Sequence, residues 1–255
     1  MRHRSIHTAL GFALVLLSPS LRAQELPAAD DLIERYVEAI GGSDAHLAPS
    51  SIRTTGTVSM AGLGIEGEFE VIQILPDQMV FRATLPGIGE QVLGYDGRVG
   101  WSMNSLLGPM LLEGAALEQA RERAHVLGPL RDPEIVPGRE TVELSEFDGE
   151  ACWRVRLEWA SGRESHDCFS ADSGLLIASE DIEVTPMGPL PVTTLVSDYR
   201  EHGGMLIPMR MIQLVMGQEQ EVTVTSVELN GVTAAELEPP PPVQTLLEGA
   251  PGGTP

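Results

Sequence analysis

Between Ser51 and Val232 the chain is built almost entirely of short segments in which apolar and polar residues alternate, and Gly, Pro or Asp ends each segment. Alternation with a period of two is typical of strands that bury one face, and short connections are typical of an antiparallel meander. The fold class is therefore α+β, mainly antiparallel β. We expect strands at residues 52–60, 65–75, 79–85, 91–95, 99–103, 139–147, 151–159, 164–170, 175–184, 192–201, 206–213 and 221–229.

Two segments have the period of a helix. Residues 30–40 place acids in the first turn and the pair Gly41-Gly42 at the end, so we expect an amphipathic helix that covers one face of the sheet. The long connection at 109–137 contains a second helix at 114–127, which we interpret as a lid. One side of this lid helix carries Leu117, Ala120, Ala124 and Leu127.

Both ends of the chain differ from this region. Arg2 and Arg4 precede an apolar run at 8–17 and a small residue at Ala23, which predicts a secretory signal peptide at residues 1–23. We then expect a periplasmic protein without a transmembrane anchor after cleavage, because the apolar run is too short to span a bilayer. Residues 24–238 form the predicted domain, and the Pro/Gly-rich tail at 239–255 is expected to be disordered.

The charge restricts the partners. The formal net charge is −21, and it becomes −24 once residues 1–23 are removed, because that segment contains three Arg and no acid. Such a chain repels nucleic acid and anionic lipid surfaces. We therefore expect no nucleic-acid partner.

Cys152 and Cys168 flank a predicted hairpin whose turn lies near Gly162. Strand alternation places both thiols on the polar face of their strands, where they can meet. In an oxidising compartment a disulfide is expected, with two free thiols as the alternative.

No arrangement of residues indicates catalysis, a metal or a cofactor. Ser165, His166 and Asp167 have the residue types of a nucleophilic triad, but along a strand His166 points away from the other two. The glycine pattern at 62–67 is followed by a strand rather than the helix that a dinucleotide site requires. The histidines lack metal-ligand spacing. We therefore expect a protein that is not an enzyme and has no cofactor.

Several local patterns, taken in order along residues 28–240, are similar to the exported outer-membrane lipoprotein-sorting proteins, the LolA-like superfamily. The patterns are the helix end Tyr36-Val37-Glu38-Ala39-Ile40-Gly41-Gly42, the strand Pro76-Asp77-Gln78-Met79-Val80-Phe81-Arg82, Pro86, the turn Gly94-Tyr95-Asp96-Gly97 with Trp101, Phe169 with Gly174-Leu175-Leu176, Asp198-Tyr199-Arg200 with Gly204 and Pro208, and Leu237 with Pro239. The resemblance implies a curved, incompletely closed β-barrel with an N-terminal helix and a lid helix. It also implies an apolar concave face that receives a lipid or a lipoprotein acyl group. Carriers in the family tend to have an Arg before the proline that matches Pro76, where this chain has Leu75.

The strongest ligand-binding candidates are apolar residues in the cavity and in two apolar loops at 106–112 and 186–191, which would form its lips. They are Phe69, Val71, Met79, Phe81, Trp101, Met103, Met110, Leu117, Met187, Leu190, Met209 and Met211. Methionine adapts to irregular apolar shapes and suits a deformable lining. Two alternatives stay open: these side chains fill a barrel core, or the two loops bind an envelope protein partner in a regulatory or assembly module.

Overall fold

One antiparallel sheet organises the molecule. A computed structural model describes residues 26–127, 132–185 and 188–249, so the predicted signal peptide lies outside the described residues. The sheet has thirteen strands in the order β6-β5-β4-β3-β2-β1-β13-β12-β11-β10-β9-β8-β7. The strands are β1 (Ser51–Met60), β2 (Ile65–Ile74), β3 (Gln78–Leu85), β4 (Gly89–Tyr95), β5 (Gly100–Asn104), β6 (Gly108–Leu111), β7 (Gly138–Phe147), β8 (Glu150–Glu158), β9 (Glu164–Ser170), β10 (Leu176–Thr185), β11 (Gly188–His202), β12 (Met205–Val215) and β13 (Gln218–Leu229).

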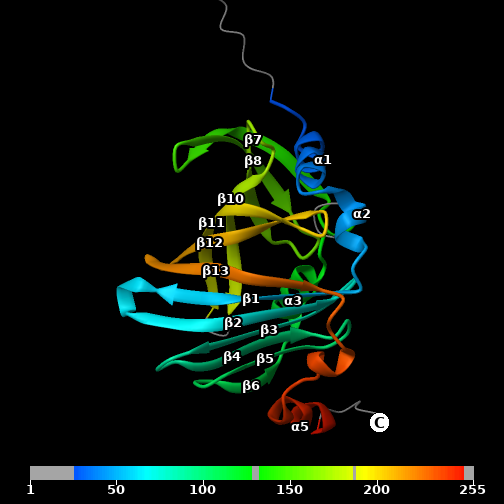
Figure 1. Cartoon of the computed structure of the whole chain (residues 1–255), viewed down its shortest axis with the longest axis vertical. Helices are drawn as coiled ribbons and strands as arrows, with labels where there is room; N and C mark the ends of the chain where they lie inside the picture. Colours follow the sequence, from blue (N-terminus) through cyan, green and yellow to red (C-terminus); the bar gives the residue numbers. More distant parts are fainter. Residues whose placement is uncertain (1–25, 128–131, 186–187, 250–255) are drawn as a thin grey trace, which may run out of the picture.

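The order of the strands confirms the predicted meander. Strands that follow each other in sequence pair with each other, apart from β6 and β7. In addition, β13 pairs with β1 and so joins the two halves of the sheet. The sheet curls strongly (Figure 1), yet the two edge strands β6 and β7 do not pair with each other in the described part of the chain. The predicted curved and incompletely closed barrel is therefore confirmed.

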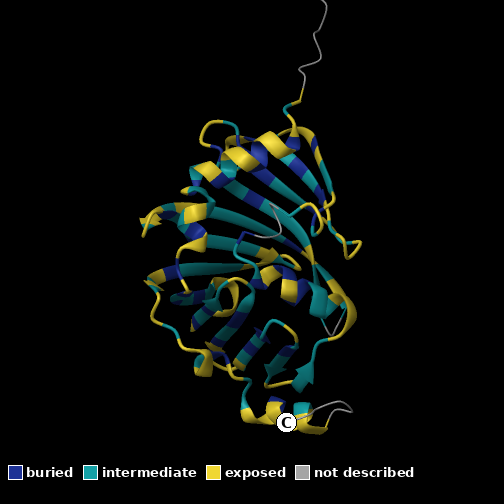
Figure 2. Cartoon of the chain, turned by 90° about the vertical axis from the view of Figure 1, so that its right-hand side faces the viewer, coloured by how far each residue is buried: buried dark blue, intermediate teal, exposed yellow. Residues whose placement is uncertain are grey.

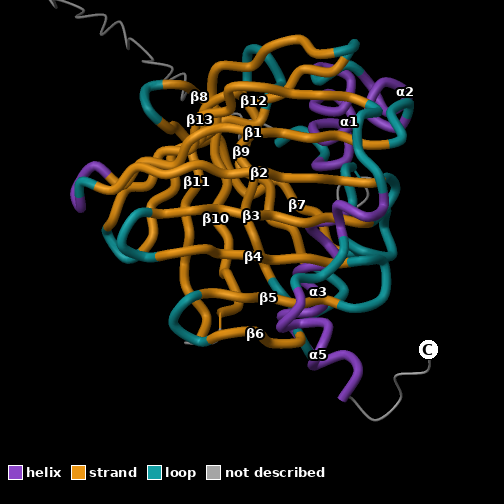
Figure 3. The backbone as a smooth tube through the Cα atoms, turned by 60° about the horizontal axis from the view of Figure 1, so that its bottom comes forward, coloured by secondary structure: helices purple, strands orange, loops and turns teal. Residues whose placement is uncertain are grey.

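The helices lie on different faces of this sheet. They are α1 (Ala29–Ala39), α2 (Gly42–Leu47), α3 (Gly114–Ala124) and α5 (Pro241–Gly249), with short 3-10 turns η1 (Ala61–Leu63) and η2 (Ala234–Leu237). The sheet curves around α3 (Figure 1), and the face that α1 and α3 contact is called the inner face. Figure 3 shows η1 at one end of the strands, whereas α1, α2, α3 and α5 lie toward the other end.

Helix α1 forms because its apolar residues recur at helical spacing, and it buries them against β8 and β9. Leu32 and Ile33 pack with Val155, Leu157 and Phe169 in one core cluster. The Tyr36 ring lies 5.3 Å from the Phe169 ring, centroid to centroid. The first predicted helix is therefore present, and it covers the inner face of one end of the sheet.

Residues 241–249 differ from the expectation of a disordered tail. They form α5, and Val243 is completely buried with Trp101 and Val92 on the outer face. Pro at the start of a helix loses no hydrogen bond, so the Pro-rich stretch is compatible with a helix N-terminus. The tail has too few apolar residues to form a core by itself, but it buries Val243 against the apolar outer face of β4 and β5.

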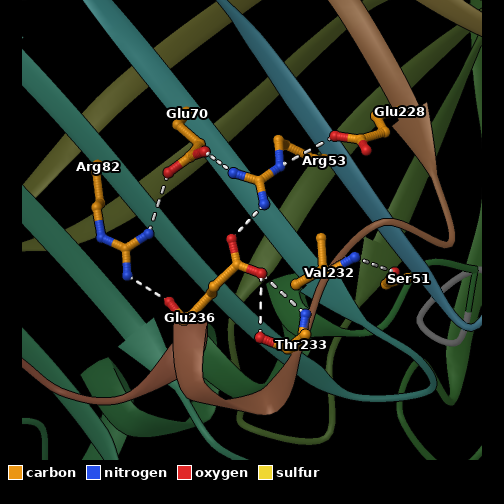
Figure 4. Close-up of polar contacts among 8 residues, drawn as sticks. All are labelled: Ser51, Arg53, Glu70, Arg82, Glu228, Val232, Thr233 and Glu236. Atoms are coloured by element: carbon orange, nitrogen blue, oxygen red, sulfur yellow. Dashed lines mark hydrogen bonds and ion pairs between the residues drawn. The ribbon is translucent and has the colours of Figure 1, made fainter.

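A polar network on the outer face holds the segment that leads to α5 (Figure 4). Arg53 Nη1 donates to Glu70 at 2.6 Å and Arg82 Nη1 donates to the same carboxylate at 3.1 Å. Arg53 also pairs with Glu236, and Arg82 donates to the Glu236 carbonyl at 2.5 Å. Glu236 in turn closes a capping box with Thr233 at the start of η2. Each Arg therefore contacts both the sheet and the C-terminal segment.

The residues predicted as an apolar loop at 106–112 partly form a strand. Gly108–Leu111 is β6, paired with β5, while Leu106 and Leu107 remain exposed in the turn between them.

Figure 2 shows that the strands are mostly buried or half-buried, whereas exposed positions gather in turns and on helices. Within the described residues, no helix combines the length and the apolar composition needed to cross a bilayer.

Candidate binding surface on the inner face

The inner face of β1, β2, β3, β12 and β13 carries a continuous set of apolar side chains, which we call the apolar trough. Its members are Val58, Phe69, Val71, Phe81, Ala83, Met209, Met211, Val222 and Val224. Strand register aligns them: Met211 lies opposite Val222, which lies opposite Val58. Val71, Phe81, Met211 and Val222 stay half-exposed. The inner face therefore presents apolar surface that an apolar ligand can bury.

Most of the predicted ligand-binding residues lie on this face. Phe69, Val71, Phe81, Met209 and Met211 belong to the trough. Met79 lies nearby on β3, and Leu117 belongs to α3, whose apolar side packs on Met79 and Tyr95. Met110 and Leu190 also lie on the inner face, because their pairing continues the same register. Met187 lies outside the described residues.

Trp101 and Met103 lie on the outer face, contrary to the expectation of a cavity lining. They pack with Val80, Leu237 and Val243, so α5 covers them. Trp101 pairs with Gly94, and a Cβ at Gly94 would lie 2.2 Å from the indole ring. Glycine at position 94 therefore leaves room for the ring against the outer face. The sequence interpretation did not predict α5, whose apolar side packs on this surface.

Helix α3 is fastened across the inner face by polar contacts. Its apolar side, with Ala120 and Ala124, packs on Met79 and Tyr95. The Gln119 amide donates to the Ile182 carbonyl at 3.0 Å and accepts from the Val184 N–H at 2.9 Å. The Gln119 side chain thus hydrogen-bonds both a carbonyl and an N–H of the β10 backbone, as a paired strand does.

A buried ion pair adds to this attachment. Arg163, in the β8–β9 turn, donates to Glu122 of α3 at 2.6 Å and to Asp181 of β10 at 2.5 Å. The side chains of Arg163 and Glu122 are only 11% and 6% exposed. The Arg163 guanidinium also lies 3.8 Å from the centroid of the Trp159 ring. Arg163 therefore fastens α3 to β10, a role that no local pattern in the sequence indicates.

Polar residues form a line beside the trough, which we call the polar row. Cross-strand pairing runs from Asp167 to Ser179, then to Thr194, Gln213 and Gln220. All five side chains are half-exposed. Gln220 donates to Gln213 at 3.3 Å. The inner face therefore has an apolar zone and a polar zone next to each other.

Asp167 ends the polar row in an unusual environment. Burial, together with the negative charge of Asp181, raises the pKa of Asp167 to about 7, and Arg163 opposes this shift. Tyr36 and Tyr199 lie beside it and hydrogen-bond to each other. Burial raises the pKa of Tyr36 to about 12 and raises that of Tyr199 also. Burial therefore disfavours the charged form of Asp167.

The structure agrees that Ser165, His166 and Asp167 do not form a triad. Ser165 and Asp167 pair with Leu157 and Val155 on the inner face. His166 pairs with Arg156 and points to the outer face, where burial lowers its pKa. No group of three or more His, Cys, Asp or Glu in the described ranges could hold a metal ion.

The disulfide between Cys152 and Cys168 forms, with a Cα–Cα distance of 5.4 Å. Both cysteines share a face with Arg154, as the sequence predicted, but neither is exposed there. They are buried with Ala178 under Phe147 and Leu195. The polar face of these strands therefore contains an apolar patch that only the packing of neighbouring strands creates.

A separate hollow of about 770 Å³ lies outside α1. Its walls include Asp30, Glu34, Glu38 and Asp44, with Arg139 paired to Asp30 at 3.2 Å. A bound acyl chain would lie against these carboxylates, although Ile33, Val37 and Val136 also line the hollow, so it suits an acyl chain less well than the trough does. The trough remains the surface whose chemistry matches an apolar ligand.

Comparison with known proteins finds similarity in structure rather than in sequence. No protein-family model and no curated protein sequence matches the chain. A solved LolA superfamily protein from Nitrosomonas europaea superposes with a TM-score of 0.55 over 84% of this chain and 98% of that one, at 14% identity. The chain has the LolA-like fold.

Two further structures agree with this LolA-like fold. One is described as an outer membrane lipoprotein-sorting protein domain, from Vibrio parahaemolyticus, with a TM-score of 0.52 and 9% identity over 82% of this chain and 95% of that chain. The other is a DUF1329 family protein from Desulfovibrio piger, with a TM-score of 0.55 and 10% identity over the same shares. At such identities the likeness establishes the architecture alone.

Proposed function

We propose that this protein is a periplasmic carrier that holds a lipid, a lipoprotein acyl chain or a similar apolar group in the apolar trough. The observation that carries the proposal is the row of half-exposed apolar side chains, including Phe81, Met211 and Val222, inside a curved sheet. The LolA-like fold supports it, because a solved structure with this fold is described as a lipoprotein-sorting domain. The apolar run at residues 8–17 supports export.

The driving force would be removal of apolar surface from water, worth about 25 cal/mol per Å². An acyl chain that covers the trough needs no charged anchor for useful affinity. Helix α3 lies at one border of the trough, on Met79 and Tyr95, so its release from Arg163 would widen access. In this proposal the inner face binds and the helix regulates, with no bond made or broken.

Adjacent residues of β12 provide a matched test. Met211 points into the trough, whereas Ile212 points to the outer face, and both are half-exposed. We expect Met211→Gln to weaken binding of a fluorescent fatty-acid probe about tenfold, whereas Ile212→Gln leaves it unchanged. Protein purified from a periplasmic host should also release lipid into organic extracts. Equal effects of the two substitutions, with no lipid in repeated extracts, would refute the carrier function.

A second function, binding of an envelope protein partner, has one specific observation in its favour. Leu106 is 87% exposed and Leu107 is 51% exposed in the β5–β6 turn. Exposed leucines next to each other often mark a contact surface. If this function holds, the pair Leu106→Ser and Leu107→Ser abolishes pull-down of a partner without changing uptake of the lipid probe. Loss of probe uptake in that variant would assign these leucines to the carrier instead.

A further inference from the structure

The two zones of the inner face lie close enough for one amphiphilic molecule to contact both. Thr194, Gln213 and Gln220 of the polar row are each two residues from a trough-side position in the same strand, namely Val196, Met211 and Val222. Two residues of a strand span about 7 Å. A ligand with an apolar chain in the trough can therefore place its polar head on the polar row.

Asp167 determines the charge that this head should have. Within the described residues, its carboxylate forms no hydrogen bond and no ion pair, although it lies deep in the fold. It is nevertheless half-exposed, so it borders a recess that solvent reaches. A deep carboxylate without a partner is unfavourable, and a cationic ligand would relieve that penalty.

The charged and titratable groups around Asp167 are all engaged elsewhere or have the same sign. Arg163, from the β8–β9 turn, already binds Glu122 of α3 and Asp181 of β10. Asp181 is itself acidic. Among the described residues, the cation whose charge acts on Asp167 is Arg163, and its printed hydrogen bonds go to Glu122 and Asp181 instead.

The two phenols beside Asp167 do not neutralise it either. Tyr199 donates its hydroxyl hydrogen to the Leu176 carbonyl at 2.8 Å. Tyr36 and Tyr199 also hydrogen-bond to each other, so the two phenols satisfy one another and the backbone rather than Asp167. The Tyr36 oxygen keeps a lone pair, and its ring offers a π face to a cation. This side of the recess therefore offers oxygen lone pairs and an aromatic face to a cation.

We propose that the ligand is an amphiphile whose head carries a protonated amine, bound between Asp167 and Tyr36, with the rest of the head on the polar row. The proposal rests on the carrier function and specifies its ligand class. Asp167 and Asp181 would repel a carboxylate or phosphate head at this position. An uncharged head would bind through the chain alone. The expected order of affinity is therefore amine, then alcohol, then carboxylate.

Three probes of equal chain length test this order: dodecylamine, dodecanol and dodecanoate, each below its micelle concentration. Binding is measured at pH 8 by displacement of a fluorescent apolar dye from the whole mature protein. We expect dodecylamine to bind about tenfold or more tightly than dodecanol, as for a hydrogen bond to a charged group. Asp167→Asn should remove this preference and leave dodecanol binding unchanged. Asp31→Asn, the same substitution at an exposed position of α1, should preserve it.

A second measurement uses the unmodified protein. At pH 6 the Asp167 carboxyl is largely protonated, because its pKa is about 7, and an ammonium group would displace that proton. Titration calorimetry in buffers of different ionisation enthalpy should then show release of nearly one proton for each dodecylamine bound, and none for dodecanol. The amine preference should also grow from pH 6 to pH 8.

The outcomes separate the two proposals. If none of the three probes binds, the carrier function fails and this inference fails with it. If all three bind within about twofold of one another, or if Asp167→Asn keeps the amine preference, the amine site is refuted while the carrier function stands. Absence of proton release at pH 6 likewise refutes the amine site.

Discussion

Asp167 makes the stability of the ligand-free protein depend on pH in an unusual direction. Its pKa rises from an ordinary 3.8 to about 7 on folding, mainly through burial. The folded state therefore binds the proton more tightly than the unfolded state does. Between these two pKa values the folded protein keeps a proton that the unfolded chain has lost, so stability falls as pH rises. Above pH 7 the full penalty is present.

The size of the effect follows from the shift. Each pKa unit corresponds to 1.36 kcal/mol, so a rise from 3.8 to about 7 corresponds to about 4 kcal/mol. This figure is an upper bound, because the side chain is half-exposed and water screens part of the penalty. Asp167→Asn keeps the shape of the side chain and removes its ionisation. We expect the variant to gain stability over the natural protein from pH 4 to pH 8, by up to about 4 kcal/mol.

Urea unfolding followed by tryptophan fluorescence at several pH values measures this difference. Other carboxyl groups titrate in both proteins, so they cancel when one free energy of unfolding is subtracted from the other. Asp31→Asn serves as the control, and its difference from the natural protein should stay constant with pH. Parallel pH profiles for the natural protein and Asp167→Asn would show that Asp167 is not held in a desolvated recess.

Three other predictions concern the attachments between elements. Replacing Cys152 and Cys168 by Ala should lower the free energy of unfolding by about 3 kcal/mol, since the bond closes a loop of sequence separation 16, and an unchanged urea midpoint would contradict this. Arg163→Met should speed amide hydrogen exchange in α3, because it breaks the buried ion pair with Glu122. Arg121→Met, which breaks an exposed ion pair on the same helix, should not. Equal exchange rates in the two variants would contradict the attachment of α3 through Arg163. Val243→Asp should release α5 and increase acrylamide quenching of tryptophan, because Trp101 loses its cover, whereas the exposed Thr245→Asp should leave quenching as it is.

Local pattern determined much of the architecture. Alternation of apolar and polar residues locates strands because each strand here has one face buried and the other more exposed. The helix α1 was equally visible, since its apolar residues recur every three to four positions and Gly41 ends it with a positive φ. Strand β6 escaped detection because Gly108–Leu111 is short, contains Pro109 and has no alternation; its pairing with β5 makes it a strand.

Tertiary structure decided which face each residue serves. The sequence fixes that Trp101 and Met103 share one side of β5, but only the docking of α5 makes that side the outer one. The order in which β9 to β13 pair aligns Asp167, Ser179, Thr194, Gln213 and Gln220, which are scattered over more than fifty residues of sequence. Contacts between distant segments also place Arg163 against Glu122. Alternation is a property of one strand, whereas register and curvature depend on all strands together, and for that reason the polar row and the helix tether emerge only from the folded chain.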